Sequence, residues 1–350
     1  MTTFIVLLFT VLIGFAREKD KLNSKPLKSN ALKITELKTI APDEGFYDRI
    51  YASLSSNGKL VVADIGNRTI NIYDENYKRI KQFGKEGSGP GEFENIFGVS
   101  TSNDRIYVRS HFNRISIFDF KGNHIKDVNS FEFGSGEMVF NDGIIMKYKD
   151  DAKYLMVVYD KNGEVTKQIE NKNYKEPETR GNRMMLTISG SSYVPYKNGY
   201  VKAERGEYLF KFFDKSFNET ESYTKDFERV KRDLSGFNFS LKMEGASKKQ
   251  QAEAQQRMKE QAMKQLGEYE DDVNSALGFV GDYLLLSVAT SAENKLLIDV
   301  ISPDKQYFTQ VELEGDEIIN SSVQQNKLLI AYKNEEQGPY LKVYDLSIQN

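Results

Sequence analysis

The stretch LVVADIGNRTINIYDENYKRIKQFGKEGSGPGEF runs from Leu60 to Phe93 and decides the fold. Leu60–Asp64 and Thr69–Tyr73 are rich in β-branched and aromatic residues, and a short turn joins them. A second turn leads into Arg79–Phe83, and a glycine-rich loop follows at Gly84–Gly91. The unit therefore predicts three antiparallel strands and a loop whose glycines tolerate positive φ.

Degraded copies of this unit recur along the chain. The shared feature is an apolar run that ends in a polar turn, anchored at Asp74, Asp119, Asp160, Asp214, Ser302 and Asp345. A second β-rich run precedes each anchor. Most intervals match the period of roughly 40–50 residues that four-stranded propeller blades show, and one interval is about twice as long.

The two ends of the repeat array complement each other. The last unit stops after its third strand, whereas ITELKTI at Ile34–Ile40 is a strand without a unit of its own. Pairing of Ile34–Ile40 with Leu341–Tyr344 would close the ring and remove its free edges. The sequence thus predicts an all-β six-bladed β-propeller over residues 33–350, closed by an N-terminal strand.

The first sixteen residues, MTTFIVLLFTVLIGFA, form a short apolar run with Gly14 and Ala16 at the positions of a signal-peptidase site. A basic region before the run is missing, and a short buried segment or a mis-assigned start is the alternative. We expect a secreted or periplasmic product. No cysteine follows the run, so we expect no lipid anchor and no stable membrane anchor after processing. Residues 17–32 are polar and patternless and are predicted to be a linker.

The repeat at the start of the propeller carries a family resemblance. Ala63-Asp64, Asn67-Arg68 and the glycine loop from Phe83 to Phe93 resemble an NHL repeat of a six-bladed propeller. The next repeat keeps Asn113-Arg114 but has Arg109-Ser110 where Ala-Asp is expected. With its signal-like N-terminus, the chain is similar to the secreted six-bladed and TolB-like propeller proteins of Bacteroidetes-type bacteria.

Composition excludes several function classes. The net charge of −3 argues against nucleic-acid binding, which usually needs a basic excess. The absence of cysteine removes disulfides, thiol nucleophiles and thiolate metal sites. His111 and His124 are the only histidines, so one chain cannot build a three-histidine metal site.

The long interval contains an insertion at about residues 228–275, between blades four and five. Its centre, Ser247–Leu266, has strong helix formers and a narrow apolar stripe, which predicts one surface helix. A smaller excursion at Asn171–Met185 separates blades three and four and carries Arg180 and Arg183. Both connections lie on the same face of a propeller, so that face is the predicted binding face.

Candidate ligand-binding residues follow from this topology. The ends of the second strands and their turns, together with the smaller excursion, supply Asp64, Arg68, Arg109, His111, Arg114, Lys147, Arg180, Arg183, Glu204 and Tyr332. Each could instead be a solvated turn residue, and Asp64 and Arg68 could simply hydrogen-bond their turn. The glycine loop lacks the Lys-Ser/Thr and the helix of a phosphate-binding loop, so we interpret it as structural.

Three functions remain open on the sequence alone. The leading hypothesis is a non-enzymatic propeller, without a cofactor, that presents one face to a protein, peptide or glycan. The alternative is a hydrolase or lyase with a divalent cation, calcium by its resemblance to lactonase-like propellers, in the central channel. The lyases that resemble NHL propellers use histidine-bound zinc, which two histidines disfavour. RNA binding is opposed by the net charge and the N-terminus. Measurement of the metal bound to the purified protein would distinguish the binding propeller from the metal-dependent enzyme.

Overall fold

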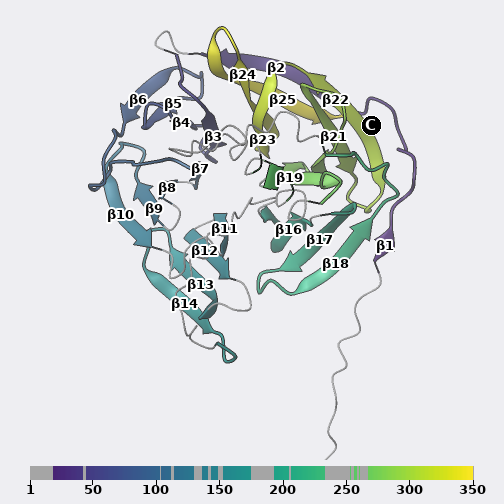
Figure 1. The fold of residues 1–350 in the computed structure, drawn as a ribbon, viewed down its shortest axis with the longest axis horizontal. Coiled ribbons are helices and arrows are strands. Elements are labelled where there is room, and N and C mark those ends of the chain that lie inside the picture. The colour runs from purple at the N-terminus through teal and green to yellow at the C-terminus, as the bar shows by residue number, and fades with distance from the viewer. Residues whose placement is uncertain are drawn as a thin grey trace, which may run out of the picture.

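The structure is a computed structural model. It describes residues 19–41, 45–102, 104–111, 114–129, 136–140, 143–148, 153–174, 193–204, 206–232, 253, 256–257, 260 and 267–349. Six antiparallel sheets stand around a common axis, which confirms the predicted six-bladed β-propeller (Figure 1).

The first three blades follow one another in the chain. Blade one contains β3 (Ile50–Leu54), β4 (Leu60–Asp64), β5 (Thr69–Tyr73) and β6 (Arg79–Phe83). Blade two contains β7 (Gly98–Thr101), β8 (Ile106–His111), β9 (Arg114–Phe118) and β10 (His124–Asn129). Blade three contains β11 (Gly136–Phe140), β12 (Gly143–Tyr148), β13 (Tyr154–Asp160) and β14 (Val165–Glu170).

N-terminal strands add to the sheets of blades four and six, and blade five lies between them in the chain. Blade four contains β15 (Val194–Tyr196), β16 (Gly199–Ala203), β17 (Leu209–Asp214) and β18 (Glu219–Thr224), with β1 (Asp20–Lys21) at its outer edge. Blade five contains β19 (Val273–Val280), β20 (Tyr283–Val288), β21 (Lys295–Ile301) and β22 (Tyr307–Glu314). Blade six contains β23 (Glu317–Gln324), β24 (Lys327–Asn334), β25 (Gly338–Ile348) and β2 (Leu32–Ile40).

Blade six is closed as the sequence predicts. β2 pairs antiparallel with β25, with Ile34 opposite Leu346 and Ile40 opposite Leu341. In Figure 1 the purple β2 lies beside the yellow-green strands of blade six. The backbone groups that the outer edge of β25 would otherwise expose are therefore hydrogen-bonded within the ring.

The segment predicted to be a linker, residues 17–32, packs against the propeller over its described residues. β1 adds to β18 as a parallel strand, with Lys21 opposite Thr224. Leu22 is buried beside this strand, and the side chain of Asn23 accepts a 2.8 Å hydrogen bond from the backbone N–H of Tyr307. Residues 19–31 thus run along the outside of blades four and five before the chain enters β2 (Figure 1). We call this segment the N-terminal belt.

The hairpins between third and fourth strands share one turn. In blade two, Asp119 Oδ1 accepts hydrogen bonds of 2.9 Å from the backbone N–H groups of Lys121 and Asn123. The residue three positions after the anchor has positive φ in five blades: Tyr77, Gly122, Gly163, Phe217 and Lys305. A short acceptor side chain at the anchor stabilises this tight turn, which explains why aspartate marks the repeat in the sequence.

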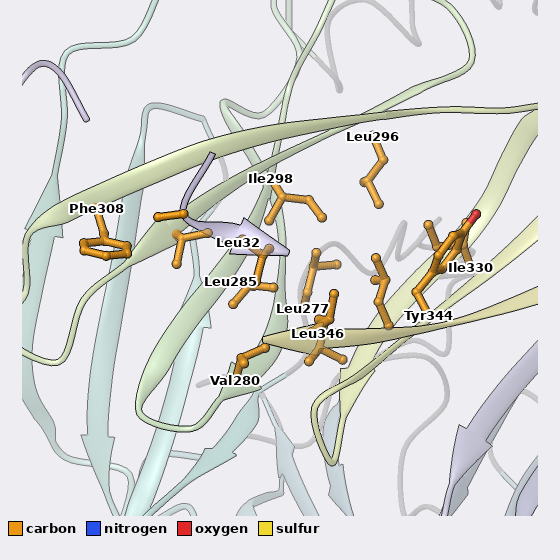
Figure 2. Close-up of a cluster of buried hydrophobic side chains, with 14 of the residues drawn as sticks. Leu32, Leu277, Val280, Leu285, Leu296, Ile298, Phe308, Ile330, Tyr344 and Leu346 are labelled. Carbon is orange, nitrogen blue, oxygen red and sulfur yellow. The ribbon is translucent and has the colours of Figure 1, made fainter. Parts of the chain in front are cut away.

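Apolar clusters fill the space between neighbouring blades. Figure 2 shows the cluster between blades five and six, to which Leu277 and Leu285 of blade five and Ile330 of blade six belong. Comparable clusters pack the other five interfaces. Each fully buried aliphatic side chain contributes about 1.5–3 kcal/mol, so adjacent blades stabilise one another.

The long insertion leaves the ring through a short stem. Lys231 and Tyr269 form an antiparallel bridge, and Arg232 lies 2.7 Å from the carboxylate of Glu270. The predicted helix lies largely outside the described residues, where only Glu253, Gln256, Arg257 and Glu260 represent it, in helical conformation. Within the described part of the chain, no helix has the length and apolar character needed to cross a membrane.

Candidate functional site: the central cavity

A cavity of about 810 Å³ lies where the inner strands of all six blades converge. Its lining includes residues of β3, β7, β11, β15, β19 and β23, which are the first strands of their blades and the inner edges of their sheets. Because an edge strand has one row of unpaired N–H and C=O groups, inner strands offer backbone donors and acceptors toward the axis. The volume lies in the range of about 300–1,000 Å³ typical of ligand sites.

The side chains that line the cavity are mostly neutral and polar or aromatic. Hydroxyl and amide groups come from Ser53, Ser56, Ser100, Thr101, Ser102, Ser275, Asn320, Ser321, Ser322, Gln324 and Gln325. Aromatic rings come from Tyr51, Tyr107, Phe140, Tyr193 and Phe279. Among the described lining residues, Arg109 alone carries a formal charge.

Arg109 lies in β8, directly opposite Gly98 of the inner strand β7. Its side chain is partly buried, and no hydrogen bond or ion pair joins its guanidinium to another described residue. Burial lowers the pKa of Arg109 below its ordinary value, while the nearby hydroxyl of Tyr51 acts in the opposite direction. Arginine stays protonated in proteins, so this positive charge persists beside the cavity.

Asp64 and Arg68 hold the turn between β4 and β5. Asp64 is buried and accepts hydrogen bonds from the backbone of Tyr47 at 3.2 Å and from the side chain of Asn67 at 2.8 Å. Burial raises the pKa of Asp64, against the effect of the hydrogen bonds from Asn67. Arg68 donates to the carbonyl of Ile65 at 2.6 Å. These contacts match the structural interpretation that the sequence left open for both residues.

Arg114 and the glycine loop form a second local structure. The guanidinium of Arg114 donates to Ser110 Oγ at 3.0 Å and to the Glu92 carbonyl at 3.4 Å. The Glu92 carboxylate accepts a hydrogen bond from the Gly89 N–H at 3.0 Å and lies 2.9 Å from Lys85 Nζ. An added Cβ at Gly87, where φ is positive, would lie 2.1 Å from the same carboxylate. These contacts support the structural interpretation of the loop.

The other candidates at the ends of second strands are not among the described residues that line the cavity, although Lys147 contacts one of those residues, Tyr193. Lys147 donates to Tyr193 Oη at 3.0 Å and lies over the ring of Phe217. Glu204 lies 3.7 Å from Lys202. Tyr332 is buried in the cluster between blades five and six and stacks on Tyr340 with ring centroids 5.3 Å apart.

Three candidates cannot be placed beside these residues. His111 ends β8, where its backbone is described but its side chain is not, and Arg180 and Arg183 lie outside the described residues. Of the predicted site residues whose side chains are described, the structure brings Arg109 to the cavity and leaves the others in turns or between blades.

The sequence interpretation missed the first strands of the blades. Tyr51, Gly98, Tyr193 and Asn320 line the cavity, but none of them lies in the anchored runs or their turns. Their position in the sequence could have identified them. Each of these four residues comes shortly before a second β-rich run, and therefore in or beside the inner strand of its blade.

Comparison with known proteins supports the fold. No family model and no curated protein matches the sequence. A member of the DUF4221 family from Bacteroides vulgatus has 15% identity and a TM-score of 0.51, covering 92% of this chain and 100% of its own. A candidate exported protein from Bacteroides fragilis has 12% identity and a TM-score of 0.55, covering 94% and 99%. These similarities confirm the predicted likeness to six-bladed propellers of Bacteroidetes at the level of the fold.

Proposed function

We propose that this protein is an extracytoplasmic binding propeller that receives a polar ligand in its central cavity, on the side that carries the long connections. The observation that carries the proposal is the lining: a space of about 810 Å³ bordered by hydroxyls, amides and aromatic rings from all six blades. Such a surface can hydrogen-bond and stack on a ligand without supplying a nucleophile.

The proposed location rests on two independent features. The apolar run at residues 1–16 ends in a small-residue pattern that suits export. One of the structurally similar proteins, from Bacteroides fragilis, is described as a candidate exported protein. The chain has no cysteine, so the ring folds without disulfides in any compartment.

The calcium-dependent hydrolase or lyase fits the described cavity less well. Calcium prefers several oxygen ligands with carboxylates among them. The described lining offers hydroxyl, amide and backbone oxygens, but no aspartate or glutamate. Among the described residues, no three histidine, cysteine, aspartate or glutamate side chains cluster closely enough to hold a metal ion.

Ligand screening with a cavity-filling variant tests the proposal. The purified protein from Arg17 onward is screened against arrays of glycans and short peptides, in parallel with Gly98→Leu, which places a side chain in the cavity. We expect at least one ligand that binds the parent protein and binds Gly98→Leu at least tenfold more weakly. Ligands that bind both proteins equally would place the site elsewhere, and stoichiometric calcium in the purified parent protein would favour the enzyme.

A further inference from the structure

We propose that Arg109 makes the central cavity selective for a carboxylated sugar, a ligand of the uronic-acid class. This inference rests on the proposed function and adds the chemistry of the ligand. It starts from one observation, an arginine at a neutral cavity that no described residue neutralises.

The charge requires a partner of opposite sign. A partly buried guanidinium loses part of its hydration, and it cannot relieve that cost by losing its proton. Two other cations with little exposure have carboxylate partners: Arg232 lies 2.7 Å from Glu270, and Lys225 forms an ion pair with Asp299. At Arg109 a ligand carboxylate would supply the missing charge and accept two parallel N–H hydrogen bonds in the geometry that suits this pair.

Open space lies beside the same charge. Gly98 pairs with Arg109 across β7 and β8, and a Cβ added at Gly98 would meet no atom within 4 Å. Gly278 also lines the cavity, yet its added Cβ would lie 2.1 Å from the Val323 carbonyl oxygen. Glycine at position 98 is therefore not required by backbone crowding, and it leaves room for a ligand group next to the guanidinium.

The rest of the lining favours a hydroxylated body over an apolar one. Serine, threonine, asparagine and glutamine side chains can donate to and accept from sugar hydroxyls. The half-buried rings of Tyr51 and Phe140 line the same space and offer flat apolar surfaces of the kind that sugar rings cover. Among the described lining residues, one cation accompanies many neutral polar groups, which matches a sugar that carries a carboxylate beside its hydroxyls.

Paired ligands that differ in one group test the inference. Di- and trisaccharides of galacturonic and glucuronic acid are titrated calorimetrically into the protein, beside galactose and glucose oligomers of the same length. We expect the uronates to bind about ten- to a hundredfold more tightly than the neutral sugars, the range that a charge-assisted hydrogen-bond pair provides. Arg109→Gln should remove this preference, so that uronates and neutral sugars of the same length bind with similar affinity.

Two further variants separate folding from binding. Arg79→Gln removes an arginine from β6, the outer strand of blade one, and should keep the uronate preference. Gly98→Leu keeps Arg109 but fills the space beside it, and should weaken uronate binding with an unchanged melting temperature.

The outcomes distinguish the two proposals. Neutral sugars that bind as tightly as uronates, with no effect of Arg109→Gln, would overturn the carboxylate inference and leave the binding propeller standing. Binding of acetylated dipeptide acids in place of uronates would overturn the sugar class. If no array ligand and no sugar of the panel binds the parent protein, both proposals fail.

Discussion

Lys225 Nζ lies 2.5 Å from Asp299 Oδ2, and this buried ion pair joins blade four to blade five. Lys225 follows β18 directly, whereas Asp299 lies in β21. Tyr208 Oη donates to the same carboxylate at 2.9 Å, and burial followed by the charge of Asp299 raises the pKa of Tyr208. Tyr208 therefore keeps its proton and remains a hydrogen-bond donor to this carboxylate.

Removal of one charge from this pair should destabilise the protein strongly. Lys225→Met leaves Asp299 buried with neutral donors only, and we expect a loss of about 3–5 kcal/mol in the free energy of unfolding. Denaturant melts measure this loss. Lys21→Met is the matched control, because the Lys21–Asp226 pair is exposed and should cost about 1 kcal/mol or less. Equal losses in the two variants would show that the buried pair has no special role.

Closure of the ring should depend on β2. Deletion of residues 33–41 exposes the edge of β25 and opens the space between blades six and one, where Ile40 is buried beside Leu341. We expect a large drop in melting temperature and increased aggregation, because the free edge can pair with other chains. A truncation that melts like the full chain would contradict closure by this strand.

The N-terminal belt should contribute a smaller, separable part of the stability. Leu22→Ala removes a buried side chain beside β18, and we expect a cost of about 2–3 kcal/mol by denaturant melts. Leu27, which is 54% exposed in the same segment, is the control: Leu27→Ala should change stability by less than about 0.5 kcal/mol. If the belt only tethers the signal segment, neither variant should change the free energy of unfolding.

Two inner-strand glycines should respond to alanine in opposite ways. At Gly98 an added Cβ finds open space, so Gly98→Ala should be neutral or stabilising by up to about 1 kcal/mol through the unfolded chain. At Gly278, φ is +141° and the added Cβ would lie 2.1 Å from the Val323 carbonyl oxygen. Gly278→Ala should therefore cost at least about 1–3 kcal/mol. Thermal and urea melts of both variants test the contrast.

The repeated aspartate turns should make stability depend on acid pH. Hydrogen bonds from Asn218 lower the pKa of Asp214, and the backbone N–H of Glu164 leads the causes that lower the pKa of Asp160. Because the folded pKa is below the unfolded value of about 3.8, the ionised turns stabilise the fold above that pH. This contribution is lost as the pH falls through the lowered folded values. Asp214→Asn should reduce the slope of unfolding free energy against pH below pH 4, and an unchanged slope would contradict this account.

The long insertion should be replaceable without loss of the ring. Its stem is held by Arg232–Glu270 and by Arg229, whose guanidinium lies 3.0 Å from Asp272. Replacement of Lys242–Gly267 with a short Gly-Ser linker keeps this stem, and we expect a nearly unchanged melting temperature. Loss of the folded ring in this variant would show that the insertion is part of the core and would weaken the prediction of a binding face on its side.

The strands and turns were predictable because their causes are local. Leu60–Asp64, Thr69–Tyr73 and Arg79–Phe83 were predicted with the bounds that β4, β5 and β6 have. The turn at Asp119 is complete within five residues, since its acceptor and both of its backbone donors lie there. Closure by Ile34–Ile40 was predictable for a different reason. Counting four strands per repeat leaves the last repeat one strand short and leaves one N-terminal strand without a repeat of its own.

The candidate site was only partly predictable. Arg109 was named from its place at the end of a second strand, and it lies among the residues that line the cavity. Tyr332 was named by the same rule, yet its ring is buried between blades five and six. The rule could not separate them, because the direction of a side chain at this position depends on the neighbouring blade, which sequence spacing does not describe.

The sequence by itself determined the second and third strands of the blades, the aspartate turns, the number of blades and the strand that closes the ring, because each follows from hydrogen bonds within a few residues or from counting repeats. The tertiary structure decided what lies on the axis and what covers the outer edges. Asp20–Lys21 becomes a strand because β18 offers a free edge some two hundred residues away. Arg109 becomes the charge at the cavity because Gly98, opposite it on β7, has no side chain to fill the space.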